Sequence, residues 1–198
     1  MGTQIRLTRQ GNRWWLRCAG ALLGAALGVQ AIPGTAQAAV TGYVTPLYSA
    51  AAAYHTKCVM PRNGVAFNGA PLVLARCNGD PRSQGWFGNN DRSVRSAIDW
   101  PDGVCVGLAN RGSTTNGTPL ILWDCHLHPD QRWRFRPLGN GNYAWVNAPS
   151  GKCVGLADRG STDDGTPLVI WDCHLHPDQR WRMNGSPYVF GLGGGGNI

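Results

Sequence analysis

The sequence predicts an all-β chain built from three related units. A segment that begins at Cys105 recurs at Cys153, and a more divergent copy begins at Cys58. A fixed period near fifty residues indicates repeated supersecondary units that bury a shared core. The two close copies, residues 105–135 and 153–183, are offset by 48 (153 − 105) and differ only at 110/158, 115/163, 116/164, 121/169, 122/170 and 135/183.

Composition supports the same fold class. The chain has 28 Gly and 13 Pro, which are typical of many turns between short strands. All 11 acidic residues are Asp, and none is Glu. Since Glu favours helices and Asp favours turns, and since no stretch carries a helical period, an all-β chain is expected.

The first 38 residues have the layout of a secretory signal peptide. Residues 1–17 are basic without an acid, residues 18–32 are apolar, and Ala36-Gln37-Ala38 is a small-x-small cleavage site. The apolar stretch is shorter than the roughly 20 residues that span a bilayer, which disfavours a membrane anchor. We therefore expect a secreted, extracellular protein that begins near Ala39 and has no membrane span after processing.

The charge of the mature chain is small. The whole chain carries a formal charge of +7, but from residue 39 onward 14 Lys or Arg face 11 Asp, which leaves 14 − 11 = +3. Nucleic-acid binding needs a denser basic stripe, so no nucleic-acid partner is expected.

Six cysteines remain after processing, two in each unit. Three equivalent units most simply form three equivalent local disulfides, and each would close a loop of about 20 residues, worth on the order of 3 kcal/mol. A zinc site is the alternative, but no CxxC pair has metal spacing. The expected pairs are Cys58–Cys77, Cys105–Cys125 and Cys153–Cys173.

Four strands can be placed in each unit. The first carries the first cysteine, and a polar loop then closes on Asn-Gly or Asp-Gly, which are strong hairpin signals. The second strand is apolar, the third begins at a Gln-x-Trp triplet, and the fourth covers 93–100, 143–147 or 188–192. The predicted units are about 52–100, 101–148 and 149–192. Residues 39–51 are a linker or edge strand, and residues 193–198 are a flexible tail.

The Gln-x-Trp triplets have a structural explanation. Residues two apart in a strand share a face, so Gln and Trp point the same way. The Trp is expected to fill the core where the units meet, and the Gln amide to satisfy backbone groups of a turn that it buries. The triplets begin at Gln84, Gln131 and Gln179.

Three such triplets, each preceded by a cysteine pair around an N/D-G-T/A-P-L segment, resemble the ricin-B-type lectin domains and the similar family 13 carbohydrate-binding modules. The resemblance covers roughly residues 52–192. It implies a β-trefoil with pseudo-threefold symmetry, in which three four-stranded repeats each offer up to one shallow sugar pocket. It also implies a mostly non-catalytic role.

The resemblance also implies site residues. An aromatic face stacks on the sugar and polar groups bind its hydroxyls. The stacking position is Trp123 in the second unit and Trp171 in the third, and Ala75 in the first. The expected polar contacts are Asp130, Gln131, Asp178 and Gln179, with Asn110, His126, Asp158 and His174 at the rim.

The sequence departs from the family pattern at the main acceptor of sugar hydroxyls. The family has an Asp two residues after the first cysteine of each unit, and this chain has Met60, Gly107 and Gly155 there. The first unit is therefore interpreted as structural, and the second and third as altered pockets in which Asp130 and Asp178 supply a carboxylate from another side.

Other chemistries are disfavoured. His126-Leu127-His128 and its copy at 174–176 present alternating histidines, but no third metal ligand is evident from the sequence, so no metal or other cofactor is expected. A glycosidase needs two carboxylates at a defined separation, whereas the Asp residues here fall in turns. No nucleophile elbow, phosphate loop or HExxH motif is present, so no catalytic residue is assigned.

Two functions follow from these observations. The first is a secreted, non-catalytic lectin that binds glycans or polysaccharide through Trp123 and Trp171. Its near-identical second and third units would give avidity for repeating ligands. The second is a β-trefoil that has lost sugar binding and binds another secreted protein, as an inhibitor or a toxin-associated partner. The absence of the usual acceptor Asp favours the second.

Overall fold

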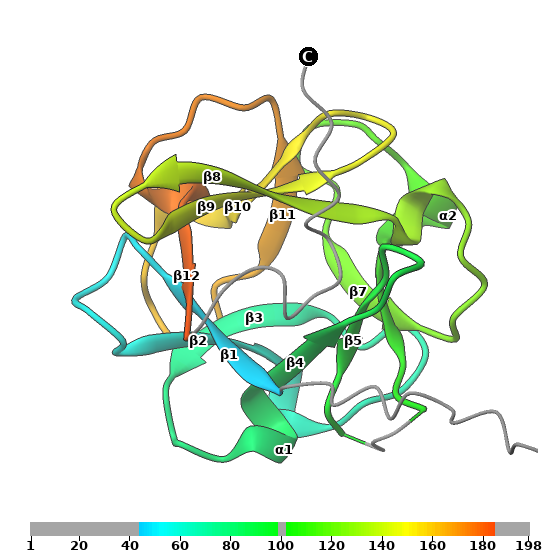
Figure 1. Cartoon of the computed structure of the whole chain (residues 1–198), viewed down its shortest axis with the longest axis horizontal. Coiled ribbons are helices and arrows are strands. Elements are labelled where there is room, and N and C mark those ends of the chain that lie inside the picture. The colour runs from blue at the N-terminus through cyan, green and yellow to red at the C-terminus, as the bar shows by residue number, and fades with distance from the viewer. Residues whose placement is uncertain (1–43, 99–101, 185–198) are drawn as a thin grey trace, which may run out of the picture. The chain divides into compact units, whose positions relative to one another are not determined.

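The computed structural model describes residues 44–98 and 102–184, all within the compact unit Val40–Ile198. The expected signal peptide, the tail at 193–198 and the expected last strand at 188–192 lie outside the described residues. The described residues contain twelve strands in a single sheet (Figure 1). They are β1 (Thr45–Ser49), β2 (Lys57–Pro61), β3 (Leu72–Arg76), β4 (Gly85–Gly88), β5 (Val94–Ser96), β6 (Cys105–Leu108), β7 (Leu120–Trp123), β8 (Trp133–Gly139), β9 (Asn142–Asn147), β10 (Cys153–Leu156), β11 (Leu168–Trp171) and β12 (Trp181–Met183).

Six short helical turns connect the strands. Each is one turn long, in agreement with the lack of helical periodicity in the sequence. They are η1 (Arg62–Gly64), α1 (Pro81–Gln84), α2 (Ala109–Gly112), η2 (Pro129–Gln131), α3 (Ala157–Gly160) and η3 (Pro177–Gln179).

The strands follow the predicted threefold pattern of antiparallel hairpins. In each unit the first two strands pair with each other: β2 with β3, β6 with β7, and β10 with β11. The third and fourth strands pair as β4 with β5 and as β8 with β9. In the third unit this pairing joins β12 to β1, with Leu47 opposite Met183. The strand β1, the first among the described residues, therefore completes the third unit.

This pairing corrects one expectation. Residues 39–51 were expected to form a linker or an edge strand, but β1 pairs with β12, β2 and β4 and is an inner strand. The sequence pattern missed it because TPLYS does not resemble the fourth strands of the other units, and pairing partners more than 130 residues away leave no local signal.

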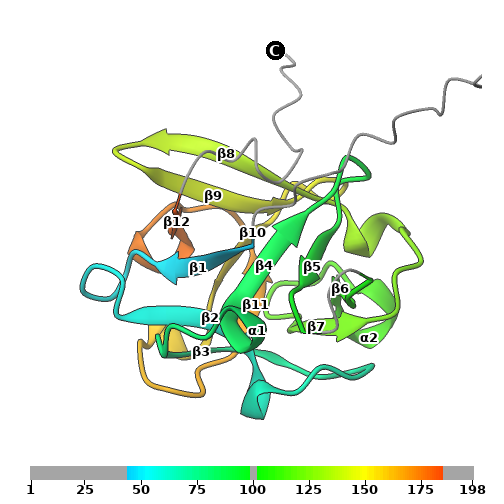
Figure 2. The same ribbon diagram turned by 60° about the horizontal axis from the view of Figure 1, so that its bottom comes forward.

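The three units are linked in a closed ring of backbone hydrogen bonds. The turn of the first unit bonds to β7, through Gly69 N–H to the Leu122 carbonyl at 2.8 Å. The turn of the second unit bonds in the same way to β11, and the turn of the third bonds back to β3. Equivalent contacts therefore recur at all three junctions, which confirms the predicted three-unit architecture. Figure 2 shows the ribbon from a second direction.

The core lies on that axis and consists of equivalent residues from the three units. Trp86, Trp133 and Trp181 of the Gln-x-Trp triplets are fully buried. Each indole N–H donates to a backbone carbonyl on the first strand of its own unit, at 2.8–3.0 Å. Because a buried donor without a partner is costly, these bonds explain why Trp recurs there. The predicted disulfides Cys58–Cys77, Cys105–Cys125 and Cys153–Cys173 are all present.

Candidate functional site

The third unit contains a cavity of about 430 Å³ at its surface. Strands β10 and β11 form its floor, and α3 and η3 form its sides. Trp171, the last residue of β11, is 46% exposed although it is one of the largest apolar side chains in the chain. The cavity is lined by Gly117, Gly155, Leu156, Ala157, Asp158, Arg159, Gly160, Val169, Trp171, His174, His176, Asp178 and Gln179.

The carboxylate of Asp178 lies close against Gly155. A Cβ atom on Gly155 would lie 3.3 Å from Asp178 Oδ2, and one on Gly160 would lie 3.0 Å from Asp178 Cβ. Both contacts are tighter than nearly all real Cβ contacts. The Asp178 side chain therefore lies between two glycines, with its carboxylate beside the position that carries the acceptor Asp in the resembling lectins.

A left-handed turn forms one side of the cavity. In α3, Asp158, Arg159 and Gly160 have φ of 52°, 58° and 83°. Non-glycine residues adopt this conformation at a cost of roughly 1–2 kcal/mol each, and rarely in succession. Such strain is concentrated at functional sites. The turn places Asp158 and Arg159 in the cavity wall.

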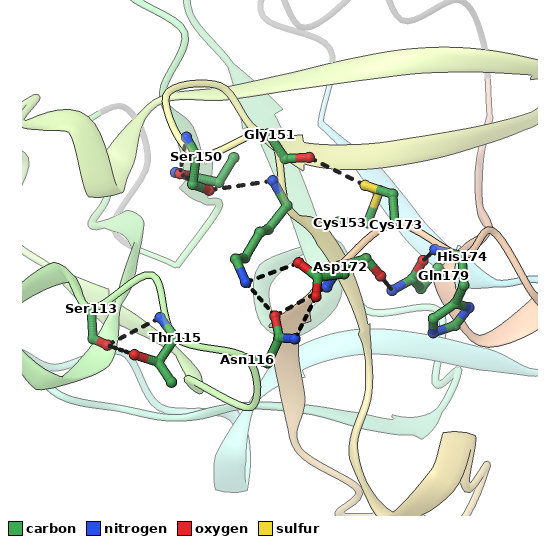
Figure 3. Close-up of polar contacts among 12 residues, drawn as sticks. Ser113, Thr115, Asn116, Ser150, Gly151, Cys153, Asp172, Cys173, His174 and Gln179 are labelled. Carbon is green, nitrogen blue, oxygen red and sulfur yellow. Dashed lines mark hydrogen bonds and ion pairs between the residues drawn. A yellow bond between two sulfur atoms is a disulfide. The ribbon is translucent and has the colours of Figure 1, made fainter.

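The loop on the opposite side is held from beneath by the motif glutamine (Figure 3). Gln179 is fully buried, and its Oε1 accepts from the backbone N–H groups of His174 and Leu175 at 2.9 and 3.0 Å. Its Nε2 donates to the Asp172 carbonyl at 3.0 Å. The Arg180 guanidinium bonds to the Leu175 carbonyl at 2.7 Å, and Leu175 itself has a φ of 57°. The loop that carries His174 is thus fixed on both sides.

The turn of the preceding unit completes the cavity. A Cβ on Gly117 would lie 3.5 Å from the Trp171 ring. Beside it, Asn116 Nδ2 donates to Asp172 Oδ2 at 2.7 Å, and the Asp172 N–H donates to Asn116 Oδ1 at 3.1 Å (Figure 3). Lys152 Nζ bonds to the same Asn116 oxygen and to Asp172 Oδ1. The hydrogen bond from Asn116, and after it the one from Lys152, lowers the pKa of Asp172 from its usual value.

The second unit repeats this arrangement. Trp123 is 42% exposed, and a Cβ on Gly107 would lie 3.1 Å from Asp130 Oδ2. Gln131 is fully buried and bonds to the loop at His126 and Leu127 as its counterpart does. In α2, Asn110 and Arg111 have φ of 55° and 58°. The two units therefore present the same set of groups.

The first unit differs, as expected from its sequence. Ala75 stands at the aromatic position and Ser83 precedes the motif Gln. Met60 Sδ lies 3.6 Å from Gln84 Nε2, and its methyl group lies 3.6 Å from where a Cβ on Gly64 would be. Met60 thus fills the position that glycine leaves open in the other units, which agrees with a structural role.

The structure brings most of the predicted site residues together. Trp171, Asp178, His174 and Asp158 line one cavity. The amides of Gln131 and Gln179 are instead buried and engaged by the loop backbone, so they position the loop. Sequence reasoning missed Gly117, which the preceding unit supplies, and the strained Arg159. Consecutive positive φ angles in non-glycine residues leave no sequence signal that could have found the latter.

A further group was missed in the sequence. The ligand atoms of His126, His128 and Asp130 all lie within 4.8 Å of one another, and so do those of His174, His176 and Asp178. The sequence suggested the histidine pairs without a third group. The structure supplies it in the helical turns η2 and η3, which follow the histidines directly and contain Asp130 and Asp178.

A twelve-stranded pseudo-threefold sheet, with an exposed tryptophan at the same position in its second and third units, is typical of a β-trefoil of the lectin type. The family model described as the ricin-type beta-trefoil lectin domain matches residues 49–181. The chain belongs to this family. No match to a curated protein was found.

Solved structures share the fold at low sequence identity. The designed threefold symmetric protein ThreeFoil has a TM-score of 0.62 and 21% identity, over 72% of this chain and 99% of that one. The exo-beta-1,3-galactanase of Clostridium thermocellum has a TM-score of 0.62 and 22% identity, over 71% of this chain and 29% of the galactanase. The ricin B-like lectin of Macrolepiota procera, solved in complex with lactose, has a TM-score of 0.57 and 16% identity, over 72% and 95%. Within 44–98 and 102–184, no helix is long and apolar enough to cross a membrane.

Proposed function

We propose that this chain is a secreted, non-catalytic lectin that binds glycan through its second and third units. A sugar ring stacks on Trp123 or Trp171, and the carboxylate of Asp130 or Asp178 accepts hydrogen bonds from its hydroxyls. The observation that carries the proposal is the position of Asp178, whose carboxylate lies close against Gly155 in a cavity that is also lined by an exposed tryptophan.

The chemistry of the cavity suits a sugar. An exposed indole face offers apolar contact to the C–H side of a pyranose ring. A carboxylate accepts more strongly than a neutral group, because hydrogen bonds to charged groups contribute about 1.5–3 kcal/mol. The absence of the usual acceptor Asp favoured a protein-binding trefoil. The carboxylate of Asp130 or Asp178, which lies beside the same position, offsets that absence.

The remaining parts of the proposal rest on different observations. Three disulfides and the signal-like N-terminus support secretion, because disulfides persist in oxidising compartments. Membership of a lectin-domain family supports a non-catalytic role. The galactanase with the same fold is about three times longer than the matched part, so its activity carries no implication for this chain.

A glycan array tests the proposal. The protein, purified with its disulfides formed, is expected to bind a subset of glycans or polysaccharides. Trp123→Ala with Trp171→Ala is expected to abolish this binding. Tyr54→Ala, which removes an exposed aromatic residue outside the cavity, serves as the control and should bind normally. Absence of binding across the array, together with a secreted protein that co-purifies, would favour the protein-binding trefoil instead.

A further inference from the structure

The histidine-rich loops of the second and third units contain a feature that sugar binding does not explain. Each places two imidazoles and one carboxylate with their ligand atoms within 4.8 Å of one another. We propose that each loop binds one divalent transition-metal ion of the zinc class, through His126, His128 and Asp130 in the second unit and His174, His176 and Asp178 in the third.

The ligand set determines the class of ion. Imidazole nitrogen suits Zn²⁺, Cu²⁺ and Ni²⁺, whereas Ca²⁺ and Mg²⁺ prefer sets of oxygen ligands. Three protein ligands with an open fourth position are a common zinc arrangement. In the third unit the three side chains line the cavity beside Trp171, so the open position faces that cavity.

The distances are within reach of coordination. Tetrahedral bonds of about 2.0–2.2 Å separate neighbouring ligand atoms by roughly 3.4 Å. His174 Nε2 lies 3.8 Å from Asp178 Oδ2, and His126 Nε2 lies 4.0 Å from Asp130 Oδ2. The four histidines are exposed, so their imidazoles have room to rotate toward a shared ion.

The backbone holds the two imidazoles of each loop near each other. Their ring centroids are 4.5 Å apart for His126 and His128 and 4.7 Å apart for His174 and His176. Between them, Leu127 and Leu175 adopt positive φ, a conformation unfavourable for leucine. The Oε1 atom of the buried motif glutamine accepts from the backbone N–H groups of the first histidine and of this leucine. The loop is therefore fixed before an ion binds.

One hydrogen bond must be released on binding. The backbone N–H of His128 donates to His126 Nδ1 at 3.2 Å, and His176 does the same to His174. A neutral imidazole that accepts at Nδ1 carries its proton on Nε2. An ion at Nε2 moves that proton to Nδ1 and displaces the N–H group. This bond is at the long end of the hydrogen-bond range, so its loss opposes metal binding weakly.

The test counts ions and uses no glycan, so its outcome is independent of the proposed lectin function. After equilibrium dialysis against Zn²⁺, elemental analysis should find two ions per chain. His126→Gln and His174→Gln should each leave one ion, and the double variant should leave none. His55→Gln, which changes the remaining histidine of the chain, is the matched control and should retain two.

Two further measurements keep the result interpretable. Circular dichroism should be unchanged in each variant, because the loop is held through backbone groups that the substitutions keep. Co²⁺ should give visible absorption bands of a low-coordinate site in the parent protein and none in the double variant. Zn²⁺ counts that stay at two in the double variant, or a parent protein that retains no ion, would overturn the proposal.

Discussion

The Asp178 carboxylate lies against Gly155, so close that a side chain at position 155 would press on it. A Cβ there would approach Asp178 Oδ2 to 3.3 Å and Gln179 Cγ to 3.0 Å. The same pair recurs as Asp130 and Gly107. In the resembling lectins the acceptor Asp stands on the strand equivalent to β10, at the position of Gly155. Here Asp178 of η3 supplies a carboxylate next to that position, and the absence of a side chain on Gly155 leaves room for it.

This relationship predicts that Gly155→Ala impairs glycan binding without unfolding the protein. A Trp123→Ala background removes binding by the second unit, so that the measured affinity is that of the third unit alone. In this background both Gly155→Ala and Asp178→Asn should weaken binding by about 10- to 100-fold, which corresponds to the loss of a hydrogen bond to a charged group. Isothermal titration with a glycan identified on the array measures the change.

A double-mutant cycle tests the cause. If Gly155→Ala acts by displacing the Asp178 carboxylate, the combined variant should bind no more weakly than Asp178→Asn alone, because both changes remove the same interaction. Additive losses would show that Gly155 contributes to binding in another way, for example through the floor of the cavity.

The contact between Asn116 and Asp172 predicts a difference in stability between two equivalent junctions. Asn116→Ala breaks two bonds to Asp172 and one to Lys152. Asn68→Ala breaks the matching bonds to Asp124, but the residue equivalent to Lys152 is Val104. Both variants are therefore expected to be destabilised, and Asn116→Ala more so, because it loses one more partner. Urea unfolding followed by tryptophan fluorescence measures both. Equal losses would mean that Lys152 adds nothing.

The same junction predicts a dependence of stability on pH. The pKa of Asp172 is lowered, first by Asn116 and then by Lys152, and that of Asp164 is lowered chiefly by Lys57. Because the folded pKa lies below the unfolded one, these groups stabilise the fold fully above the ordinary Asp pKa of about 3.9, and the contribution is lost as the pH falls through the folded pKa.

Urea midpoints measured from about pH 6 down to about pH 2 would test this. Stability should fall over the acidic part of that range, and the fall should be smaller in Asp172→Asn, which cannot titrate. If the pH profile of Asp172→Asn matched that of the parent protein, Asp172 would have the same pKa in the folded and unfolded states.

The architecture could be predicted from the sequence because each motif, weak on its own, occurs three times at a regular spacing. A single Gln-x-Trp or cysteine pair specifies little, whereas three at one spacing fix the units, the disulfides and the buried Trp86, Trp133 and Trp181. The strand β1 has no counterpart in the repeat and pairs with a strand at the far end of the chain, so no local pattern identified it.

The candidate site was predicted in part for a related reason. Trp171 and Asp178 were found because their positions match a known pattern. Gly117 was missed because the neighbouring unit supplies it, and the third member of the histidine cluster because Asp178 lies in the helical turn η3, which the sequence pattern did not predict. Contacts that depend on a change of chain direction, or on another unit, cannot be read from the spacing within one unit.

If the loops bind zinc-class ions, those ions also stabilise the fold. A ligand that binds only the folded state adds about 2.7 kcal/mol at a concentration of 100 times its dissociation constant. Zn²⁺ should therefore raise the melting temperature of the parent protein, and Ca²⁺ should not. The rise should be halved in His174→Gln and absent when His126→Gln is added, whereas a rise that persists in the double variant would place the ions elsewhere.

The buried tryptophans make a final prediction about the core. Trp133→Phe leaves the Val106 carbonyl without its 2.8 Å donor in a buried site, at a cost of about 1–3 kcal/mol beyond the lost volume. Trp145 is equally buried, but its indole N–H has no partner among the described residues. Trp145→Phe loses the same volume and also removes an unsatisfied donor, so it should be destabilised less. Denaturant unfolding of the two variants compares them directly, and equal losses would mean that the Trp133 hydrogen bond contributes no net stability.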